Sequence, residues 1–170
     1  MIHKNCHRCG HRYEVLEWPR KCAECDEMTW RNPTPVVVIV VPVRMQSTMS
    51  MLVERRGIEP GKGELALVSG YMDFGETWEE AAVREIKEEI GLVVDPAKFT
   101  QLHVCSNTSR SSVLIFCVSP SVAERELQAF EPNEEVTEIV LTTEPLELAF
   151  DSHTEALREV LAGYGYGVVR

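Results

Sequence analysis

Three glutamates, Glu85, Glu88 and Glu89, have the spacing i, i+3 and i+4. Each residue of an α-helix turns by about 100°, so these carboxylates would share an arc of about 100° on one helix face. Like charges at these spacings destabilise an isolated helix by about 0.2 to 0.5 kcal/mol per pair. A bound divalent cation would reverse that repulsion. The spacing therefore indicates a cation site, and the alternative is a solvated, charged outer face.

A second metal-ligand pattern lies near the N-terminus, where four cysteines form two C-x-x-C pairs. They are Cys6, Cys9, Cys22 and Cys25. Four thiolates satisfy the tetrahedral preference of Zn²⁺ in a closed, structural site, and a short β-ribbon can span the twelve residues between the pairs. His7 and His11 lie beside the pairs but are not needed, because four cysteines already complete the shell. Disulfides are uncommon in the cytosol, so the pattern favours zinc.

The glutamates fall in the segment with the clearest helix signals. Thr77 and Glu80 have the spacing of a capping box, and Gly91 is suited to the left-handed residue that ends many helices. The residues between them are good helix formers. We therefore expect a helix between Thr77 and Gly91.

The surroundings of this helix also favour a site. Ile86 and Ile90 lie on an arc next to the acidic one, so the helix can pack its apolar side while the carboxylates face the edge of a cleft. Gly70 and Gly75 predict a flexible loop directly before the helix, where the backbone can approach other groups closely.

Other elements are predicted from β-rich runs and polar links. Residues 34–44 and 50–56 predict a hairpin, because a short polar turn joins two strand-like runs. Further strand-like runs cover residues 101–105, 113–118 and 136–142. Ser152 followed by Glu155 predicts the cap of a second helix, which would run to about residue 161.

Length and composition limit the possible classes of protein. The 170 residues, 44% hydrophobic and 26% charged, suit one globular domain with a small appendage, and we place the boundary between residues 1–32 and 33–170. The net charge of −10 disfavours bulk binding to nucleic acid. The apolar run at residues 36–43 is far shorter than the ~20 residues that cross a bilayer. Without a secretory signal at the start, we expect a cytoplasmic protein that does not contact membranes.

The acidic helix belongs to a longer pattern. Gly70 is followed after five residues by Glu76 and after seven more by the stretch REIKEEIGL, which begins at Arg84. This pattern resembles the Nudix box at every defining position. The resemblance implies an α/β fold, an α/β/α sandwich with a mixed sheet, preceded here by a small β zinc ribbon.

In Nudix hydrolases the box holds Mg²⁺ or Mn²⁺ on a diphosphate. The resemblance implies metal ligands at Glu85, Glu88 and Glu89, one of which, or its bound water, would lead to general base catalysis. Arg84 would orient these carboxylates, and Glu76 would support the loop or an outer metal.

Two further ligands are implied outside the helix. The carbonyl of Ser69, directly before the box, resembles a ligand of the family. The family often adds a carboxylate after the box, and Glu135 fits that place best, with Glu134 next. The alternative is a pair of exposed loop acids.

A four-cysteine ribbon directly before a Nudix domain resembles the NADH diphosphatases and related FAD or ADP-ribose diphosphatases. Trp30 falls where that branch carries an aromatic residue near the adenine; the alternative is a lid that packs the ribbon on the main domain. The Ser-Gln-Pro-Trp type segment of NADH diphosphatases is replaced by CSNTSRSS at residues 105–112, without the Pro and Trp. There, Arg110 and the hydroxyls would bind a ribose or second phosphate, unless this is an ordinary surface turn. Arg55 is a further candidate for binding the nucleotide.

The leading hypothesis is a hydrolase that cleaves FAD, ADP-ribose or NADH-like small molecules into two monophosphates. A second is a Nudix hydrolase of nucleoside triphosphates or RNA 5′ ends. A third is a non-catalytic regulator that senses a nucleotide, which the complete set of glutamates disfavours. A homodimer is expected from the resemblance alone.

We expect one zinc ion per chain with a structural role. Cys22→Ser should lose the metal and destabilise the N-terminal segment, because it removes one of four ligands. Cys105→Ser, outside both pairs, should retain the metal. Elemental analysis of protein purified without chelator checks both variants, and a wild-type zinc content far below one per chain would contradict the assignment.

Overall fold

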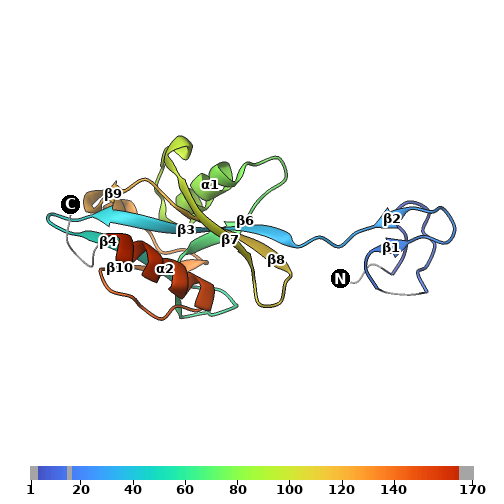
Figure 1. Ribbon diagram of the computed structural model, residues 1–170. Helices are drawn as coiled ribbons and strands as arrows, with labels where there is room; N and C mark the ends of the chain where they lie inside the picture. The colour runs from blue at the N-terminus through green and yellow to red at the C-terminus, as the bar shows by residue number, and fades with distance from the viewer. Residues whose placement is uncertain (1–3, 15–16, 165–170) are drawn as a thin grey trace. The chain divides into compact units, whose positions relative to one another are not determined.

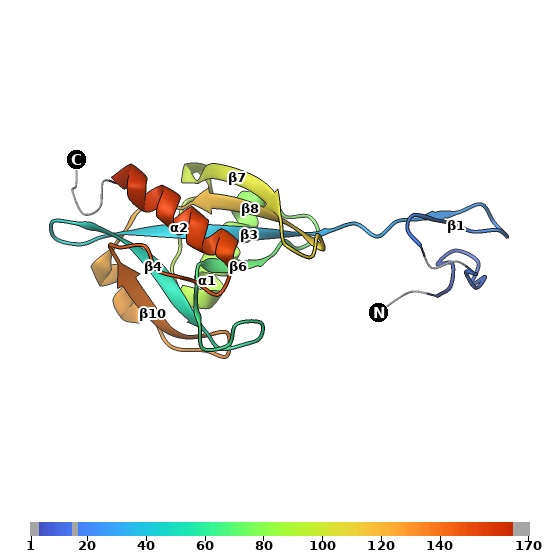
Figure 2. The same cartoon turned by 60° about the horizontal axis from the view of Figure 1, so that its bottom comes forward.

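The computed structural model describes residues 4–14 and 17–164, and the chain divides into two compact units, Met1–Pro33 and Thr34–Arg170. In the second unit, a mixed β-sheet lies between helix α1 (Trp78–Ile90) and helix α2 (Asp151–Tyr164), as Figures 1 and 2 show from two directions. This arrangement is the predicted α/β/α sandwich.

Strand β3 (Thr34–Arg44) is buried on both faces. Its odd-numbered side chains from Val37 to Val43 belong to the apolar cluster of α1, with Ile86 and Ile90. Val38 and Val40 belong to the cluster of α2. Successive side chains of a strand point to opposite faces, so a strand covered by helices on both sides needs apolar residues throughout. This requirement explains the uninterrupted apolar run.

The main sheet has the strand order β10-β4-β3-β8-β7. The strands other than β3 are β4 (Met49–Arg56), β7 (Thr100–Ser106), β8 (Ser112–Val118) and β10 (Val136–Thr142). Strands β3 and β8 are parallel, and the other neighbouring pairs in this order are antiparallel. The predicted hairpin and the three later strands are confirmed.

One edge of β3 changes partner along its length. Residues 41–44 pair with β4, whereas residues 36–39 pair with β6 (Val68–Tyr71). Strand β4 also pairs with β5 (Leu65–Ala66) at Glu54 and Arg55, and with β10 along residues 51–56. Strands β4 and β6 therefore diverge, and each brings its own side chains toward α1.

The prediction of a loop at Gly70 was wrong, because this residue lies inside β6. Four other short elements were also not predicted: β5, η1 (Pro96–Lys98), β9 (Val122–Ala123) and η2 (Glu124–Ala129). Their few residues carry no periodic pattern from which to recognise them.

The ends of α1 are as predicted. The Thr77 hydroxyl accepts from the Glu80 N–H, and the Glu80 carboxylate accepts from the Thr77 N–H. At the other end, Gly91 has φ 75° and its N–H donates to the Lys87 carbonyl. These caps fix where the helix starts and thus where its acidic residues point.

The predicted N-cap residue of the second helix, Ser152, was wrong. Helix α2 begins at Asp151, so Ser152 lies in its first turn. The N–H groups of His153 and Thr154 both donate to the carbonyl of Phe150, which closes the first turn one step earlier.

The first unit contains two similar turns around its cysteine pairs. The Gly10 N–H donates to the Cys6 carbonyl, and the Asp26 N–H donates to the Cys22 carbonyl. Gly10 and Asp26 both have positive φ, at 78° and 60°. Strands β1 (Arg20–Lys21) and β2 (Met28–Thr29) form the small antiparallel sheet of a ribbon.

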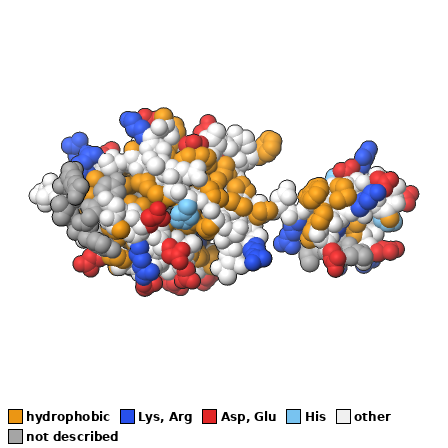
Figure 3. Space-filling model, viewed as in Figure 1, with side chains coloured by type: hydrophobic (Ala, Val, Ile, Leu, Met, Phe, Trp, Pro, Cys, Tyr) orange, Lys and Arg blue, Asp and Glu red, His pale blue; other side chains and the backbone are white. Residues whose placement is uncertain are grey.

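No helix in the described part of the chain is long and apolar enough to cross a membrane. On the face of the second unit seen in Figure 3, basic side chains lie apart from one another near the edges. Over the described residues of that face they form no continuous patch.

Helix α1 packs so closely on β6 that a side chain at position 70 would have to displace the Glu85 carboxylate. A Cβ atom on Gly70 would lie 2.0 Å from Oε1 and 2.1 Å from Cδ of Glu85. These atoms belong to a buried side chain, so they have little room to move. The close approach expected of Gly70 is therefore present, although within a strand.

Gly70→Ala should lower the melting temperature, because the new methyl group displaces the Glu85 carboxylate. Overpacking costs about 1 to 3 kcal/mol, and each kcal/mol shifts the melting temperature of a chain of this size by about 2 to 4 °C. Gly163→Ala is the control, because a Cβ there meets nothing within 4 Å. Thermal unfolding followed by circular dichroism checks the pair, and equal melting temperatures would contradict the argument.

Candidate active site

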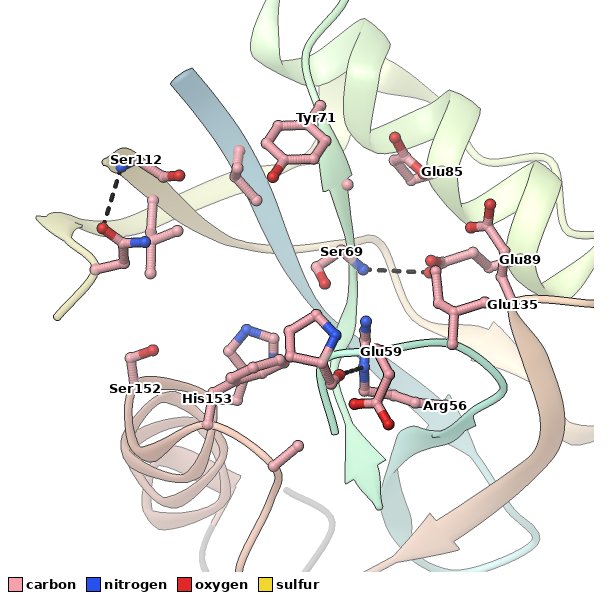
Figure 4. A pocket seen from close by; sticks show the side chains of 18 of the residues that line it. Arg56, Glu59, Ser69, Tyr71, Glu85, Glu89, Ser112, Glu135, Ser152 and His153 are labelled. Carbon is pink, nitrogen blue, oxygen red and sulfur yellow. Dashed lines mark hydrogen bonds between the residues drawn. The ribbon is translucent and has the colours of Figure 1, made fainter. Parts of the chain in front are cut away.

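A cavity of about 790 Å³ lies beside the acidic face of α1 (Figure 4). Strand β6, the turn between β7 and β8, and the start of α2 complete its walls. Two guanidinium groups, of Arg56 and Arg84, line it together with seven carboxylates. The carboxylates are those of Glu59, Asp73, Glu85, Glu88, Glu89, Glu135 and Asp151. An anion entering this cavity would be repelled unless cations accompany it.

Arg84 connects the loop, the strand and the helix around the cavity. Its guanidinium donates to both oxygens of Glu76, at 2.8 and 3.0 Å, and to the Tyr71 carbonyl at 2.7 Å. It also donates to Glu85 at 2.7 Å and to Glu88 at 3.1 Å. The hydrogen bonds from Arg84 lower the pKa of Glu76 to about 2. Arg84 therefore positions two of the three helix carboxylates.

The three glutamates of α1 differ in burial and in partners. Glu85 and Glu89 are 6% and 4% exposed, whereas the Glu88 side chain is 59% exposed. Glu85 and Glu89 therefore do not lie on a solvated outer face, which was the alternative to a cation site. Burial raises the pKa of Glu85, although Arg84 opposes the shift.

The three carboxylates also do not meet at one point, although their spacing places them on one face of the helix. Among the residues that the structure describes, only the four cysteines form a group of three or more acidic, His or Cys ligands within 4.8 Å of one another. The reason is that Arg84 holds Glu85 and Glu88 while Glu89 turns toward β6.

Glu89 contacts β6 and β4 instead of Arg84. The Ser69 N–H donates to Glu89 Oε2 at 3.2 Å. Ser69 also lines the cavity, and the role of its carbonyl as a metal ligand stays a prediction. Glu54 of β4 adjoins Glu89 on its other side, and it is 1% exposed. Burial raises the pKa of both carboxyl groups, and their mutual repulsion raises that of Glu89 further.

Sequence reasoning missed Glu54. The available signal was a lone carboxylate after the apolar residues Met51, Leu52 and Val53 of a predicted strand. Strand alternation places Glu54 on the same face as Leu52, which packs in the cluster of α1. Recognising this required knowing that α1 covers that face.

The arginine that reaches the cavity is Arg56, and the expectation for Arg55 was wrong. Arg55 donates to Glu138 at 2.7 Å and to the Gly63 carbonyl at 2.9 Å, and it does not line the cavity. Adjacent residues of a strand point to opposite faces, so only one of the two can face the cavity. Arg56 donates to the Pro60 carbonyl at 2.7 Å, and its guanidinium lies 5.3 Å from the Phe150 ring centroid.

The turn between β7 and β8 contributes hydroxyl and amide groups to the cavity, through Ser106, Asn107, Thr108 and Ser112. Arg110, expected to contact substrate, is exposed, has φ 56° and does not line the cavity. The Arg110 N–H donates to the Asn107 carbonyl, which closes the turn and keeps this residue at its tip.

Of the two acidic candidates after the box, Glu135 lines the cavity and Glu134 does not. The Glu135 N–H donates to the Asn133 side chain, and the Asn133 amide lies 3.3 Å from the Glu89 carbonyl. Asn133 thus ties the segment that carries Glu135 to the C-terminal end of α1.

Trp30 belongs to the first unit, where it is 63% exposed, and its contact with a nucleotide stays a prediction.

In the second unit, Tyr71 lines the cavity and is also 63% exposed, so its ring is available to a ligand (Figure 4). His153 lines the opposite wall, where its Nδ1 accepts from the Leu67 N–H at 3.2 Å. Burial lowers the pKa of His153 to about 3, so the ring is neutral. Neither Tyr71 nor His153 had a sequence signal.

The four cysteines of the ribbon form a compact cluster. Their sulfur atoms all lie within 4.8 Å of one another, with Cys6 and Cys25 3.7 Å apart and Cys9 and Cys22 3.6 Å apart. Zinc–sulfur bonds of about 2.3 Å in a tetrahedron place sulfurs about 3.8 Å apart, so the cluster fits a zinc ribbon. The His7 ring instead contacts the Thr29 hydroxyl.

Comparisons with known proteins agree with this geometry. The family model described as the NUDIX domain matches residues 33–163. The proteins named NAD-capped RNA hydrolase NudC from Haemophilus influenzae (strain PittGG) and Salmonella heidelberg (strain SL476) are each 29% identical to this chain over 99 residues. These residues make up 57% of this chain and 37% of each relative, so the chain matches little more than a third of their length.

Solved structures share the fold. A NUDIX hydrolase from Nitrosomonas europaea has a TM-score of 0.68 and 23% identity, over 97% of this chain and 94% of the other. The NUDIX domain of Shewanella oneidensis NrtR, in complex with ADP ribose, has a TM-score of 0.60 and 21% identity, over 78% and 90% of the two chains. The family match over residues 33–163, with the box residues placed along a cavity, shows that this chain belongs to the Nudix hydrolase family.

Proposed function

We propose that this protein hydrolyses the diphosphate bond of a dinucleotide-like substrate, such as ADP-ribose or FAD, with Mg²⁺ or Mn²⁺ held by the glutamates of α1. The observation that carries the proposal is that Glu85, Glu88 and Glu89 lie along one wall of the cavity. Its volume of about 790 Å³ is within the range of about 300 to 1,000 Å³ typical of ligand sites.

The side chains around this wall fit a hard divalent cation. Carboxylate oxygens are the ligands that Mg²⁺ and Mn²⁺ prefer, and Glu135 adds another from a separate segment. A diphosphate is itself anionic, so a cavity with seven carboxylates needs added positive charge to bind it. When bound, the metal ions would neutralise the phosphates and lower the pKa of the attacking water.

The protein's own groups then have separate tasks. Arg84 holds Glu85 and Glu88 in place through its hydrogen bonds. One of the three helix glutamates accepts the proton of the attacking water. Arg56, the other guanidinium in the cavity, offers a charge-assisted hydrogen bond to a phosphate.

Two aromatic residues suit the nucleoside part. The exposed ring of Tyr71 borders the cavity and can stack on a base, which is worth about 1 to 3 kcal/mol. Trp30, which lies in the first unit, stays a candidate for stacking from the sequence alone. In the first unit, we assign Zn²⁺ to the four-cysteine cluster as a structural ion.

A second candidate substrate is RNA that carries a dinucleotide cap, because the curated relatives named above are NAD-capped RNA hydrolases. The same diphosphate bond would be cleaved. The net charge of −10 disfavours long RNA contacts, which is why small dinucleotides are placed first.

The test is a panel of substrates with product identification in Mg²⁺ and in Mn²⁺. We expect kcat/KM to be highest for ADP-ribose and FAD, lower for NADH, and lowest for dGTP, 8-oxo-dGTP and capped RNA, with two monophosphates as products of the dinucleotides. Glu89→Gln should lower turnover by at least ~10²-fold, since it removes a cation-binding charge.

Distinct outcomes separate the hypotheses. A nucleoside triphosphate or NAD-capped RNA as the best substrate would overturn the order of substrates while the metal-dependent reaction stands. Tight binding of ADP-ribose without turnover of any compound would favour the nucleotide-sensing alternative. Undiminished turnover by Glu89→Gln at saturating metal would contradict the role of α1.

The neighbouring arginines of β4 provide a matched pair for testing the anion contact. Arg56→Ala should raise KM for the preferred substrate by ~10-fold or more with a smaller effect on kcat, because a hydrogen bond to a charged group is worth about 1.5 to 3 kcal/mol. Arg55→Ala, which removes the bond to Glu138, should change KM by less than about twofold. Steady-state kinetics would contradict this assignment if the two variants behaved alike.

A further inference from the structure

One oxygen of the buried Glu54 carboxylate has no hydrogen-bond partner. Its residue is 1% exposed, and its Oε2 atom is buried without a hydrogen-bond partner among the residues that the structure describes. Leaving a buried polar atom unsatisfied costs about 1 to 3 kcal/mol, and more for a charged group. Such an atom calls for a ligand, a proton or a cation.

The neighbours of Glu54 are other acids of the site. Its side chain is next to that of Glu89, and the charges of Glu85 and Glu135 also act on it. Arg56 is the cation that acts on Glu54, but its Nε donates to the Pro60 carbonyl. Arg84 is bonded to Glu76, Glu85 and Glu88.

The position of Glu54 in the sheet is well fixed. Its backbone lies between Ala66 of β5 and Ile139 of β10 in the pairing register. Leu52, two residues earlier on the same face, packs in the apolar cluster of α1, whereas the carboxylate at position 54 adds no apolar contact there.

We propose that Glu54 is a further ligand of the divalent-cation centre, where it and Glu89 form a buried carboxylate pair that binds one Mg²⁺ or Mn²⁺ ion. This inference rests on the proposed function, and it extends the set of ligands from the helix to strand β4. The unpartnered Oε2 atom and the adjacent Glu89 supply the oxygen ligands that such an ion prefers.

The experiment measures Mn²⁺ binding to the full-length, zinc-loaded protein, without substrate, by electron paramagnetic resonance. Glu54→Gln keeps the shape of the side chain and removes its charge. Glu138→Gln is the matched control, because Glu138 pairs with the neighbouring Arg55 on the strand beside β4 and is half exposed. Glu89→Gln is the reference for the centre itself.

We expect Glu54→Gln to weaken Mn²⁺ binding by about 10- to 100-fold and Glu138→Gln to leave it within about twofold of the wild type. The melting temperature of metal-free Glu54→Gln should be equal to or above that of the wild type, because one of two repelling buried carboxylates is gone. Added Mn²⁺ should then raise this temperature less than in the wild type.

Wild-type Mn²⁺ affinity in Glu54→Gln, with weakened binding in Glu89→Gln, would overturn this inference and leave the proposed function intact. Wild-type affinity in both variants would overturn both. If Glu54→Gln fails to fold, Glu54→Asp keeps the charge but withdraws the oxygens by one methylene group. Binding by the Asp variant should also weaken, and wild-type affinity there would count against direct ligation.

Discussion

Negative charge is concentrated and partly buried where α1 meets β4 and β6, and the surrounding structure is organised by that constraint. Glu85, Glu89 and Glu54 are nearly inaccessible, yet hydrogen bonds and ion pairs offset only part of their charge. Burying uncompensated carboxylates is among the most expensive things a fold can do. The apolar clusters on both faces of β3 stabilise the fold and offset this cost.

The first helix and the longer strands could be predicted from the sequence because local signals and packing agree, whereas the α/β/α arrangement was implied by the resemblance to the Nudix box. Thr77, Glu80 and Gly91 fix the ends of α1, and the helical period then decides which residues share a face. The uninterrupted apolar run of β3 similarly predicts a buried strand, and the structure covers it on both sides. The box resemblance identified Arg84 as the organiser of the glutamates, and its hydrogen bonds have that pattern.

Parts of the site depend on which strand faces which helix, and the sequence does not contain that information in local form. Arg55 and Arg56 are equivalent by residue type, and only the pairing of β4 with β5 and β10 shows which one turns to the cavity. Glu54 was missed for the same reason. The four residues of β6 are too few to show a strand period. Arg110 was expected to bind a ribose or a phosphate, with a surface turn as the alternative, and its turn carries it away from the cavity.

The hydrogen bonds of Arg84 have a consequence for which residues can occupy its position. A guanidinium carries five N–H donors in a fixed plane, and Arg84 makes five hydrogen bonds, to three carboxylates and one carbonyl. Lysine has the same charge but only three donors on a single atom. It would leave acceptors on the loop, the strand or the helix unmatched. Arginine suits this position through the number and direction of its donors, and a lysine there would connect the loop, the strand and the helix through fewer hydrogen bonds.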